Sequence, residues 1–148
     1  MYAAYFGLKE NPFSLSPEPR YLFLSEKHRD ALNCLVYGIQ ERKGFVLLSG
    51  DIGMGKTTIC RSLLASLDSS VETALIFNTA VDELDLLETI LGEYGVDIKG
   101  KAKNKKFFID ILNDFLLKNF ATGKTAVLLI DEAQNLSHGV LEQIRMLS

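Results

Sequence analysis

One segment constrains the fold of this chain more than any other: Gly50-Asp51-Ile52-Gly53-Met54-Gly55-Lys56-Thr57, which fits the pattern G-x-x-x-x-G-K-[ST]. Glycines allow positive φ and let a phosphate approach the backbone closely. The N–H groups from Gly53 to Thr58 are expected to form an anion-binding nest at a helix N-terminus. The pattern predicts that Lys56 reaches the β- and γ-phosphates of a nucleotide and that the Thr57 hydroxyl is a ligand of Mg²⁺.

A second motif follows an apolar run further along the chain. Val127-Leu128-Leu129-Ile130 leads directly into Asp131 and Glu132. Because open α/β sheets bind ligands at the carboxyl ends of their strands, both carboxylates are expected beside the phosphate loop. We predict that Asp131 holds Mg²⁺ and that Glu132 orients or deprotonates the attacking water. With Lys56, these are the predicted catalytic residues, and the glutamate favours hydrolysis of a nucleoside triphosphate.

Apolar runs and helical patterns alternate along the chain. Short, wholly apolar runs predict strands covered on both faces, and apolar residues at helical spacing predict helices between them. This order predicts an α/β fold with a parallel sheet. The expected strands are Phe45–Leu48, Thr73–Phe77 and Ala126–Ile130; the expected helices run from Ser25 to a stop at Gly44, from Lys56 to about Leu67, from Asp82 to Tyr94, from about Asn104 to Phe120 and from about Val140.

The first 25 residues differ from the rest in pattern. Three prolines disfavour helix, yet the segment carries many aromatic and aliphatic side chains. We therefore expect residues 1–25 to pack on the domain formed by residues 26–148. Five lysines between Lys99 and Lys106 are interpreted as a solvated loop, with a small site for nucleic acid or an anionic partner as the alternative.

Composition excludes several classes of protein. The 148 residues carry a formal net charge of −3, which argues against a strongly basic nucleic-acid binder. No apolar run is long enough to span a bilayer and no signal peptide is readable, so we expect a cytoplasmic chain. Cys34 and Cys60 lack metal-ligand spacing and are expected to be reduced core residues.

Several segments together resemble the ExeA-type (general secretion pathway A) ATPases. The most discriminating are the N-terminal aromatic-proline block and the run after the second motif. The resemblance covers essentially the whole chain. Its segments are Tyr5-Phe6-Gly7-Leu8, Asn11-Pro12-Phe13-Ser14-Leu15, Ser25 to Leu32, Phe45 to Gly50, Gly53-Met54-Gly55-Lys56-Thr57-Thr58, Ile130-Asp131-Glu132-Ala133-Gln134-Asn135-Leu136 and Leu141-Glu142-Gln143-Ile144-Arg145.

The resemblance implies a P-loop NTPase of the AAA+ type, with a three-layer αβα fold, that binds and hydrolyses ATP with Mg²⁺. Such ATPases assist the assembly of a secretion port or a type IV pilus-like machine with a partner protein. It further implies a homo-oligomer when full length, and a cytoplasmic domain of a protein anchored in the inner membrane. Peptidoglycan would be bound only through a further domain that this chain does not contain.

The chain departs from the family at its C-terminus. Similar AAA+ domains place a strand with the sensor-1 residue between the two motif-bearing strands. That strand, the arginine finger and the helical lid are expected beyond Ser148, so we expect a truncated core with little or no ATPase activity of its own. Without that strand, Phe45–Ser49 and Ala126–Ile130 would keep unpaired edges or pair differently.

Some assignments stay open at this stage. Similar AAA+ proteins cover the adenine with the N-terminal segment, which makes Phe13, Tyr21 and His28 candidates for that contact; the alternative for His28 is a surface or capping residue. A DNA-binding ATPase of the transposition or partitioning type is one alternative function, and a helicase is another. A nucleotide-gated scaffold with little turnover is the non-enzyme alternative.

Overall fold

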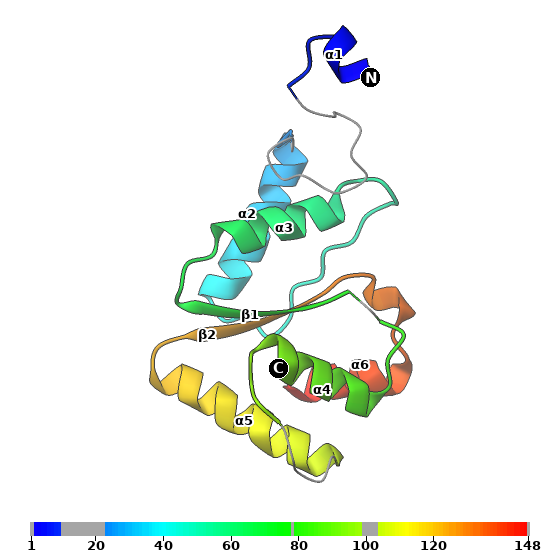
Figure 1. The fold of residues 1–148 in the computed structure, drawn as a ribbon. Helices are drawn as coiled ribbons and strands as arrows, with labels where there is room; N and C mark the ends of the chain where they lie inside the picture. The colour runs from blue at the N-terminus through cyan, green and yellow to red at the C-terminus, as the bar shows by residue number, and fades with distance from the viewer. Residues whose placement is uncertain (1, 10–22, 78, 99–103, 148) are drawn as a thin grey trace.

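The computed structural model of the chain describes residues 2–9, 23–77, 79–98 and 104–147, which form helices on either side of a small sheet (Figure 1). Most helices and both strands lie where the apolar patterns predict them. The helices are α1 (Tyr2–Tyr5), α2 (Glu26–Gln40), α3 (Lys56–Ser66), α4 (Glu83–Glu93), α5 (Lys105–Ala121) and α6 (His138–Leu147), with a 3-10 turn at Ala133–Asn135; the strands are β1 (Val71–Ile76) and β2 (Thr125–Ile130).

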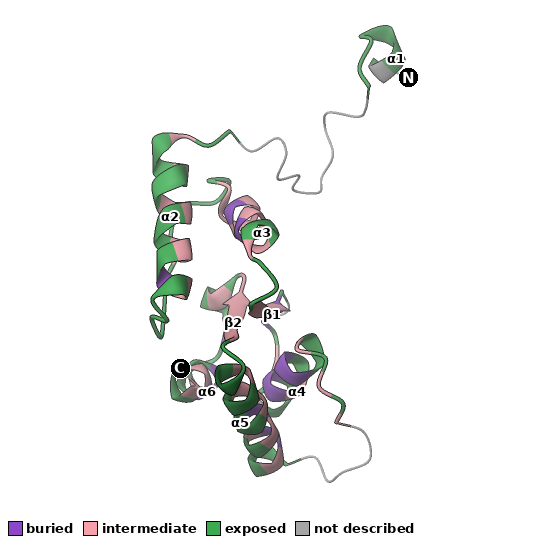
Figure 2. Cartoon of the chain, turned by 90° about the vertical axis from the view of Figure 1, so that its left-hand side faces the viewer, coloured by how far each residue is buried: buried purple, intermediate pink, exposed green. Residues whose placement is uncertain are grey.

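The sheet consists of β1 and β2 in parallel. The register runs from Val71 opposite Thr125 to Ile76 opposite Ile130. Helices α4, α5 and α6 cover one face, whereas α2 and α3 lie together on the other side (Figure 2). This arrangement confirms the predicted α/β class with helices on both faces of a parallel sheet.

Polar side chains begin three of the helices. The Ser25 hydroxyl accepts a hydrogen bond from the backbone of His28, and Asp82 and Asn104 accept bonds from the first turns of α4 and α5. These caps satisfy backbone N–H groups that have no partner inside the helix. The predicted end of α2 at Gly44 is wrong, because α2 ends at Gln40 and the chain turns at Arg42 with φ 50°.

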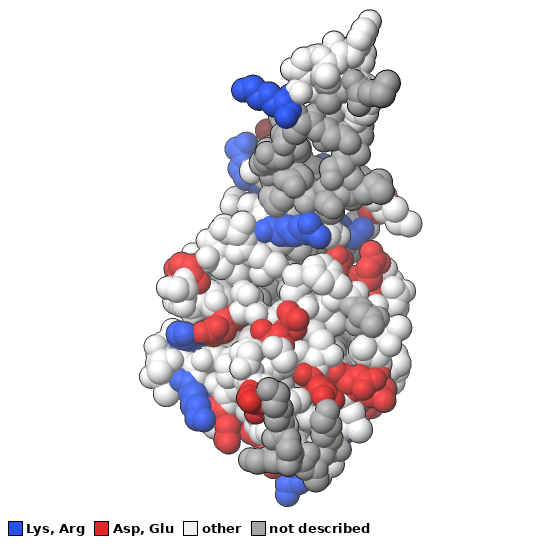
Figure 3. Space-filling view, in the orientation of Figure 1, with Lys and Arg blue, Asp and Glu red and all other residues white. Residues whose placement is uncertain are grey.

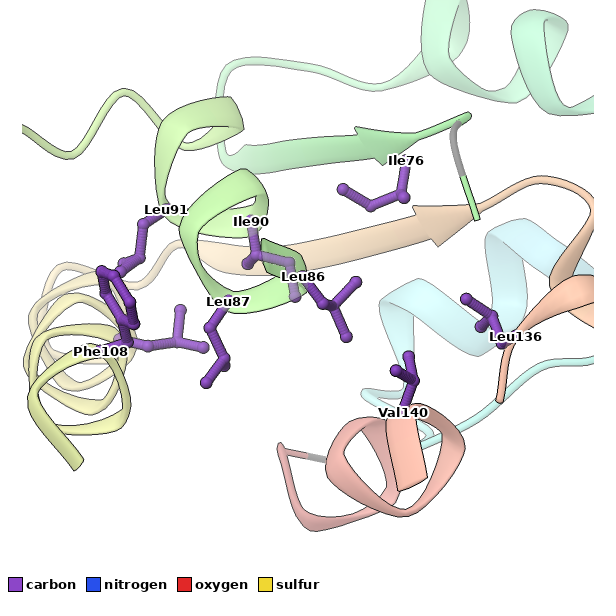
Figure 4. Packing of buried hydrophobic residues seen from close by; sticks show 9 residues of the cluster. Ile76, Leu86, Leu87, Ile90, Leu91, Phe108, Leu136 and Val140 are labelled. Carbon is purple, nitrogen blue, oxygen red and sulfur yellow. The ribbon is translucent and has the colours of Figure 1, made fainter. Parts of the chain in front are cut away.

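The core lies between the sheet and the three helices below it. Four side chains from neighbouring turns of α4 face α5, β1 and α6 (Figure 4). Within α4, Leu84 is exposed, whereas Leu86 is buried. The fully buried large side chains are Ile76, Leu86, Leu87, Ile90, Leu91, Phe108, Leu112 and Val140.

Phe45–Leu48 is not a strand, contrary to the prediction from its apolar run. Its backbone pairs with no strand in the described ranges, and Leu47 is 86% exposed. A strand exists only through its ladder of hydrogen bonds, so an apolar sequence without a partner strand stays extended but unpaired. For the same reason β2, which among the described residues pairs only with β1, is half-buried along its length and not buried on both faces.

Gly38 fixes how closely this unpaired segment approaches α2. Gly38 is buried, and a Cβ built on it would overlap the Val46 side chain. We expect Gly38→Ala to lower the free energy of unfolding by about 1 kcal/mol, because overpacking costs more than the alanine gains in helix propensity. In a Val46→Ala background, the same change should raise it by up to about 1 kcal/mol. Urea unfolding of the four variants measures both values; equal effects in both backgrounds would contradict the contact.

The structure bears on two further predictions, one for the cysteines and one for the N-terminal segment. Cys34 is exposed and Cys60 is half-buried, so neither is a core residue, although both are free thiols as expected. In the N-terminal segment, the described side chains of Tyr5 and Phe23 are 82% and 83% exposed and give no support for packing on the domain. Residues 10–22 lie outside the described part of the chain, and with them Phe13 and Tyr21.

Candidate phosphate-binding site

The loop before α3 has the backbone shape that its glycines predict. Gly53 and Gly55 have φ of 82° and 79°, in the left-handed region that disfavours side chains. Gly55 is the N-cap of α3, and no heavy atom lies within 4 Å of a Cβ built on Gly53. The loop therefore leads exposed backbone into a helix N-terminus, the arrangement that receives phosphate groups.

Lys56 lies folded over this loop. Its Nζ donates to the carbonyl oxygens of Gly50 and Asp51, both at 2.9 Å. An ammonium group has three N–H donors, so these two bonds hold the Lys56 charge at the phosphate loop and leave the third N–H for another acceptor. The Lys56 charge thus lies beside the loop that the sequence assigns to phosphate.

Thr57 and Asp131 are brought together from the two motifs. The Thr57 hydroxyl donates to Asp131 Oδ2 at 2.9 Å, across 74 positions of sequence. The Asp131 N–H donates to the carbonyl of Ile76, which places the carboxylate at the C-terminal end of β1 and β2. The second oxygen, Oδ1, accepts the backbone N–H of Glu132 at 3.0 Å. Both carboxylate oxygens therefore have a hydrogen-bond partner, Oδ2 in Thr57 beside the phosphate loop and Oδ1 in the backbone of Glu132.

Glu132 has an unusual backbone conformation. Its φ is 54°, which is uncommon for a residue with a side chain and is typical of functional sites. Its carboxylate is exposed and accepts a hydrogen bond from the side-chain amide of Gln134. The two acidic residues thus have different side-chain partners, Thr57 for Asp131 and Gln134 for Glu132.

The sequence assigned no contact with this region to two residues that the structure places there. Gln134 contacts Glu132 after the chain turns at the end of β2, and His28, considered as an adenine contact or as a surface or capping residue, contacts the carbonyl of Met54 in the phosphate loop. The Asp-Glu-Ala-Gln run marks Gln134 as a neighbour of the site, but the pattern assigns it no contact. Among the lysines predicted to form a loop, Lys105 pairs with Glu83 at 2.5 Å, and residues 99–103 lie outside the described ranges.

Cys60 lies one turn along α3 from Thr57, and the charge of Asp131 acts on its thiol. Burial, and secondarily the negative charge of Asp131, raise the pKa of the Cys60 thiol above its usual value. Because the thiolate is the nucleophile, we expect Cys60 to react with iodoacetamide more slowly than exposed Cys34, with a rate that still rises above pH 9. Mass spectrometry of Cys34→Ser and Cys60→Ser variants measures each thiol separately. Equal rates would contradict the environment described here.

The residues around Thr57 and Asp131 fit a magnesium ion and a phosphate chain. A hydroxyl that donates its proton to a carboxylate keeps its lone pairs for a cation, and Mg²⁺ prefers oxygen ligands. In nucleotide sites this ion is held by one or two protein oxygens together with phosphate oxygens. The glycine loop supplies the space for those phosphates, so both halves of the site are chemically compatible with Mg²⁺ and a nucleotide.

Comparison with known families agrees with this geometry. Residues 39–148 match the family model of an AAA domain, a range that includes both motifs. The chain belongs to the AAA domain family. This membership confirms the predicted P-loop NTPase class and accounts for the parallel sheet with helices on both faces.

One curated relative extends the resemblance to the first 38 residues. The chain is 49% identical over 148 residues to "General secretion pathway protein A" of Aeromonas hydrophila, covering 100% of the chain and 27% of that protein. The resemblance to the ExeA-type ATPases is thereby confirmed, although the chain spans only about a quarter of the relative's length. No solved structure matches. Within the described residues, no helix is both long and apolar enough to cross a membrane.

Proposed function

We propose that this AAA domain binds ATP with Mg²⁺ and hydrolyses it. The observation that carries the proposal is the hydrogen bond between Thr57 and Asp131, which joins the phosphate loop to the acidic strand end. Neither residue type alone is specific, but a hydroxyl and a carboxylate in contact beside a glycine loop support this proposal, because magnesium-nucleotide sites use such a pair.

Each residue of the site has a proposed role. The backbone from Gly50 to Thr58 encloses the phosphates, and Lys56 exchanges its loop carbonyls for the β- and γ-phosphate oxygens. Thr57 and Asp131 would hold Mg²⁺, which supplies positive charge to the phosphate chain when bound. Glu132 orients or deprotonates the attacking water, and its carboxylate accepts a hydrogen bond from the amide of Gln134.

The proposed biological setting follows from the relative and not from the site. We assign the chain to a protein of the general secretion pathway A type, which assists assembly of a secretion or pilus-like machine with a partner protein. In that setting we expect a cytoplasmic, oligomeric ATPase domain. We propose residues 26–148 as part of the ATPase core. Because Phe45–Leu48 pairs with no strand in the described residues, we propose that a further strand lies between this segment and β2.

The proposal is tested by magnesium-dependent ATP binding. We expect Asp131→Asn to weaken ATP binding about tenfold in Mg²⁺, because one charged metal ligand is lost, and to leave it unchanged in EDTA. Isothermal titration calorimetry measures both conditions. Asp114→Asn, on the exposed surface of α5, is the matched control.

Two outcomes would contradict the proposal. Wild-type protein that binds no ATP in Mg²⁺ would remove the nucleotide site. An equal loss for Asp131→Asn in Mg²⁺ and in EDTA would show that Asp131 supports the loop structurally and does not hold the metal.

A further inference from the structure

His28 connects α2 to the phosphate loop. Its Nε2 lies 3.1 Å from the carbonyl oxygen of Met54, and its Nδ1 lies 2.8 Å from the Ser25 hydroxyl. Nε2 is also 3.8 Å from a Cβ built on Gly55. Helices α2 and α3 also pack side by side (Figure 1), so the contact joins two elements of one layer.

The chemistry of the partners assigns the protons. A carbonyl oxygen only accepts, so His28 Nε2 must carry the hydrogen and donate it to Met54. In the neutral ring, Nδ1 then accepts from the Ser25 hydroxyl. Ser25 is the N-cap of α2, and its backbone position is fixed by that role. The imidazole is therefore held at both nitrogens and aimed at one peptide of the loop.

That peptide lies between the two glycines of the loop that have positive φ. Met54 lies between Gly53 and Gly55, both with positive φ, and glycine backbones rotate at little cost. The Met54–Gly55 peptide is trans, so its C=O and its N–H point in opposite directions. Holding the Met54 carbonyl toward His28 fixes the Gly55 N–H toward the opposite side of the peptide.

We propose that His28 is a positioning residue for phosphate binding: it prevents the Met54–Gly55 peptide from flipping and so keeps the Gly55 N–H directed at the phosphate chain. The inference rests on the proposed function. It replaces a direct contact between His28 and the adenine with an effect transmitted through the loop backbone. The ligand class it predicts to respond is any magnesium-bound oligophosphate, with or without a base.

The experiment compares His28→Phe and His28→Gln in the full-length protein. Phenylalanine keeps a planar ring but has no donor, whereas glutamine keeps an N–H at a similar reach. The probes are ATP and inorganic tripolyphosphate, each with Mg²⁺, titrated by calorimetry. His138→Phe, the other histidine of the chain and exposed on α6, is the control.

We expect His28→Phe to bind ATP and tripolyphosphate about 3- to 10-fold more weakly, by the same factor for both, and His28→Gln to recover most of that loss. A loss for ATP but not for tripolyphosphate would overturn the proposal in favour of a base contact. Unchanged binding of both probes by His28→Phe would also overturn it. Failure of glutamine to recover binding would show that ring packing, and not the donated hydrogen bond, matters.

A second measurement tests the hydrogen bond without any ligand. Nitrogen-15 NMR of neutral His28 in the wild type should show the Nε2–H tautomer, and a Nδ1–H tautomer would overturn the assignment. If wild-type protein binds neither ATP nor tripolyphosphate, the proposed function fails and the binding role of His28 fails with it. The tautomer would then still report whether the contact with Met54 exists.

Discussion

Replacing Lys56 with alanine is expected to reduce ATP binding about 100-fold or more. The lysine ammonium lies at the mouth of the phosphate loop, held by two carbonyl oxygens at 2.9 Å. Hydrogen bonds from a charged donor to phosphate are each worth about 1.5–3 kcal/mol, so losing the two expected bonds removes most of the affinity. Calorimetric titration with ATP and Mg²⁺ measures the loss.

The control for this change is Lys118→Ala, a surface lysine in the last turn of α5. It removes the same charge from the chain at a distance from the loop. Thermal unfolding of both variants checks that the fold persists. Wild-type affinity in Lys56→Ala would remove the basis for the phosphate site, whatever the sequence pattern.

Glu132→Gln is expected to lower the rate of ATP hydrolysis about 100-fold or more while ATP affinity stays unchanged. Glutamine has the shape of glutamate and can keep the contact with Gln134, but it cannot accept a proton from water. Removing a general base typically lowers the rate by about 10²- to 10⁴-fold, and we expect a loss of that order for Glu132→Gln. Steady-state phosphate release by the full-length protein, together with ATP titration, separates the two effects.

Glu142→Gln on α6 serves as the matched control, because Glu142 pairs only with neighbouring Arg145 among the contacts described for it. Unchanged hydrolysis in Glu132→Gln would reject Glu132 as the base. Weaker ATP binding together with slower hydrolysis would place Glu132 in the nucleotide-binding shell instead. Little turnover in the wild type itself would favour a nucleotide-gated scaffold.

The surface charge bears on the alternative of a DNA-binding ATPase. Acidic side chains lie over the α4 region in Figure 3, and the described lysine of the predicted basic loop, Lys105, is paired with Glu83. Like charge repels a nucleic-acid backbone, so we expect the described residues of this face not to bind DNA. DNA binding with a steep dependence on salt would argue against this interpretation.

Features that depend on local sequence pattern could be predicted before the fold was known. Glycines at fixed positions before Lys56 predict a loop with positive φ, because few other residues adopt that backbone, and the structure has it at Gly53 and Gly55. Apolar residues at helical spacing predict α4 and α5, because one face must be buried. The order of motifs predicts that Thr57 and Asp131 meet at the end of a parallel sheet, and they do.

Features that depend on a partner far away in the sequence could be read only from the folded chain. Phe45–Leu48 has the composition of a buried strand, but hydrogen bonding to a neighbour defines a strand, and none pairs with it in the described residues. His28 is compatible with a cap, a surface residue or a base contact until α2 places its ring against Met54. Local sequence specifies backbone preference and which side chains prefer burial, whereas a hydrogen bond between segments exists only where packing brings donor and acceptor within about 3 Å.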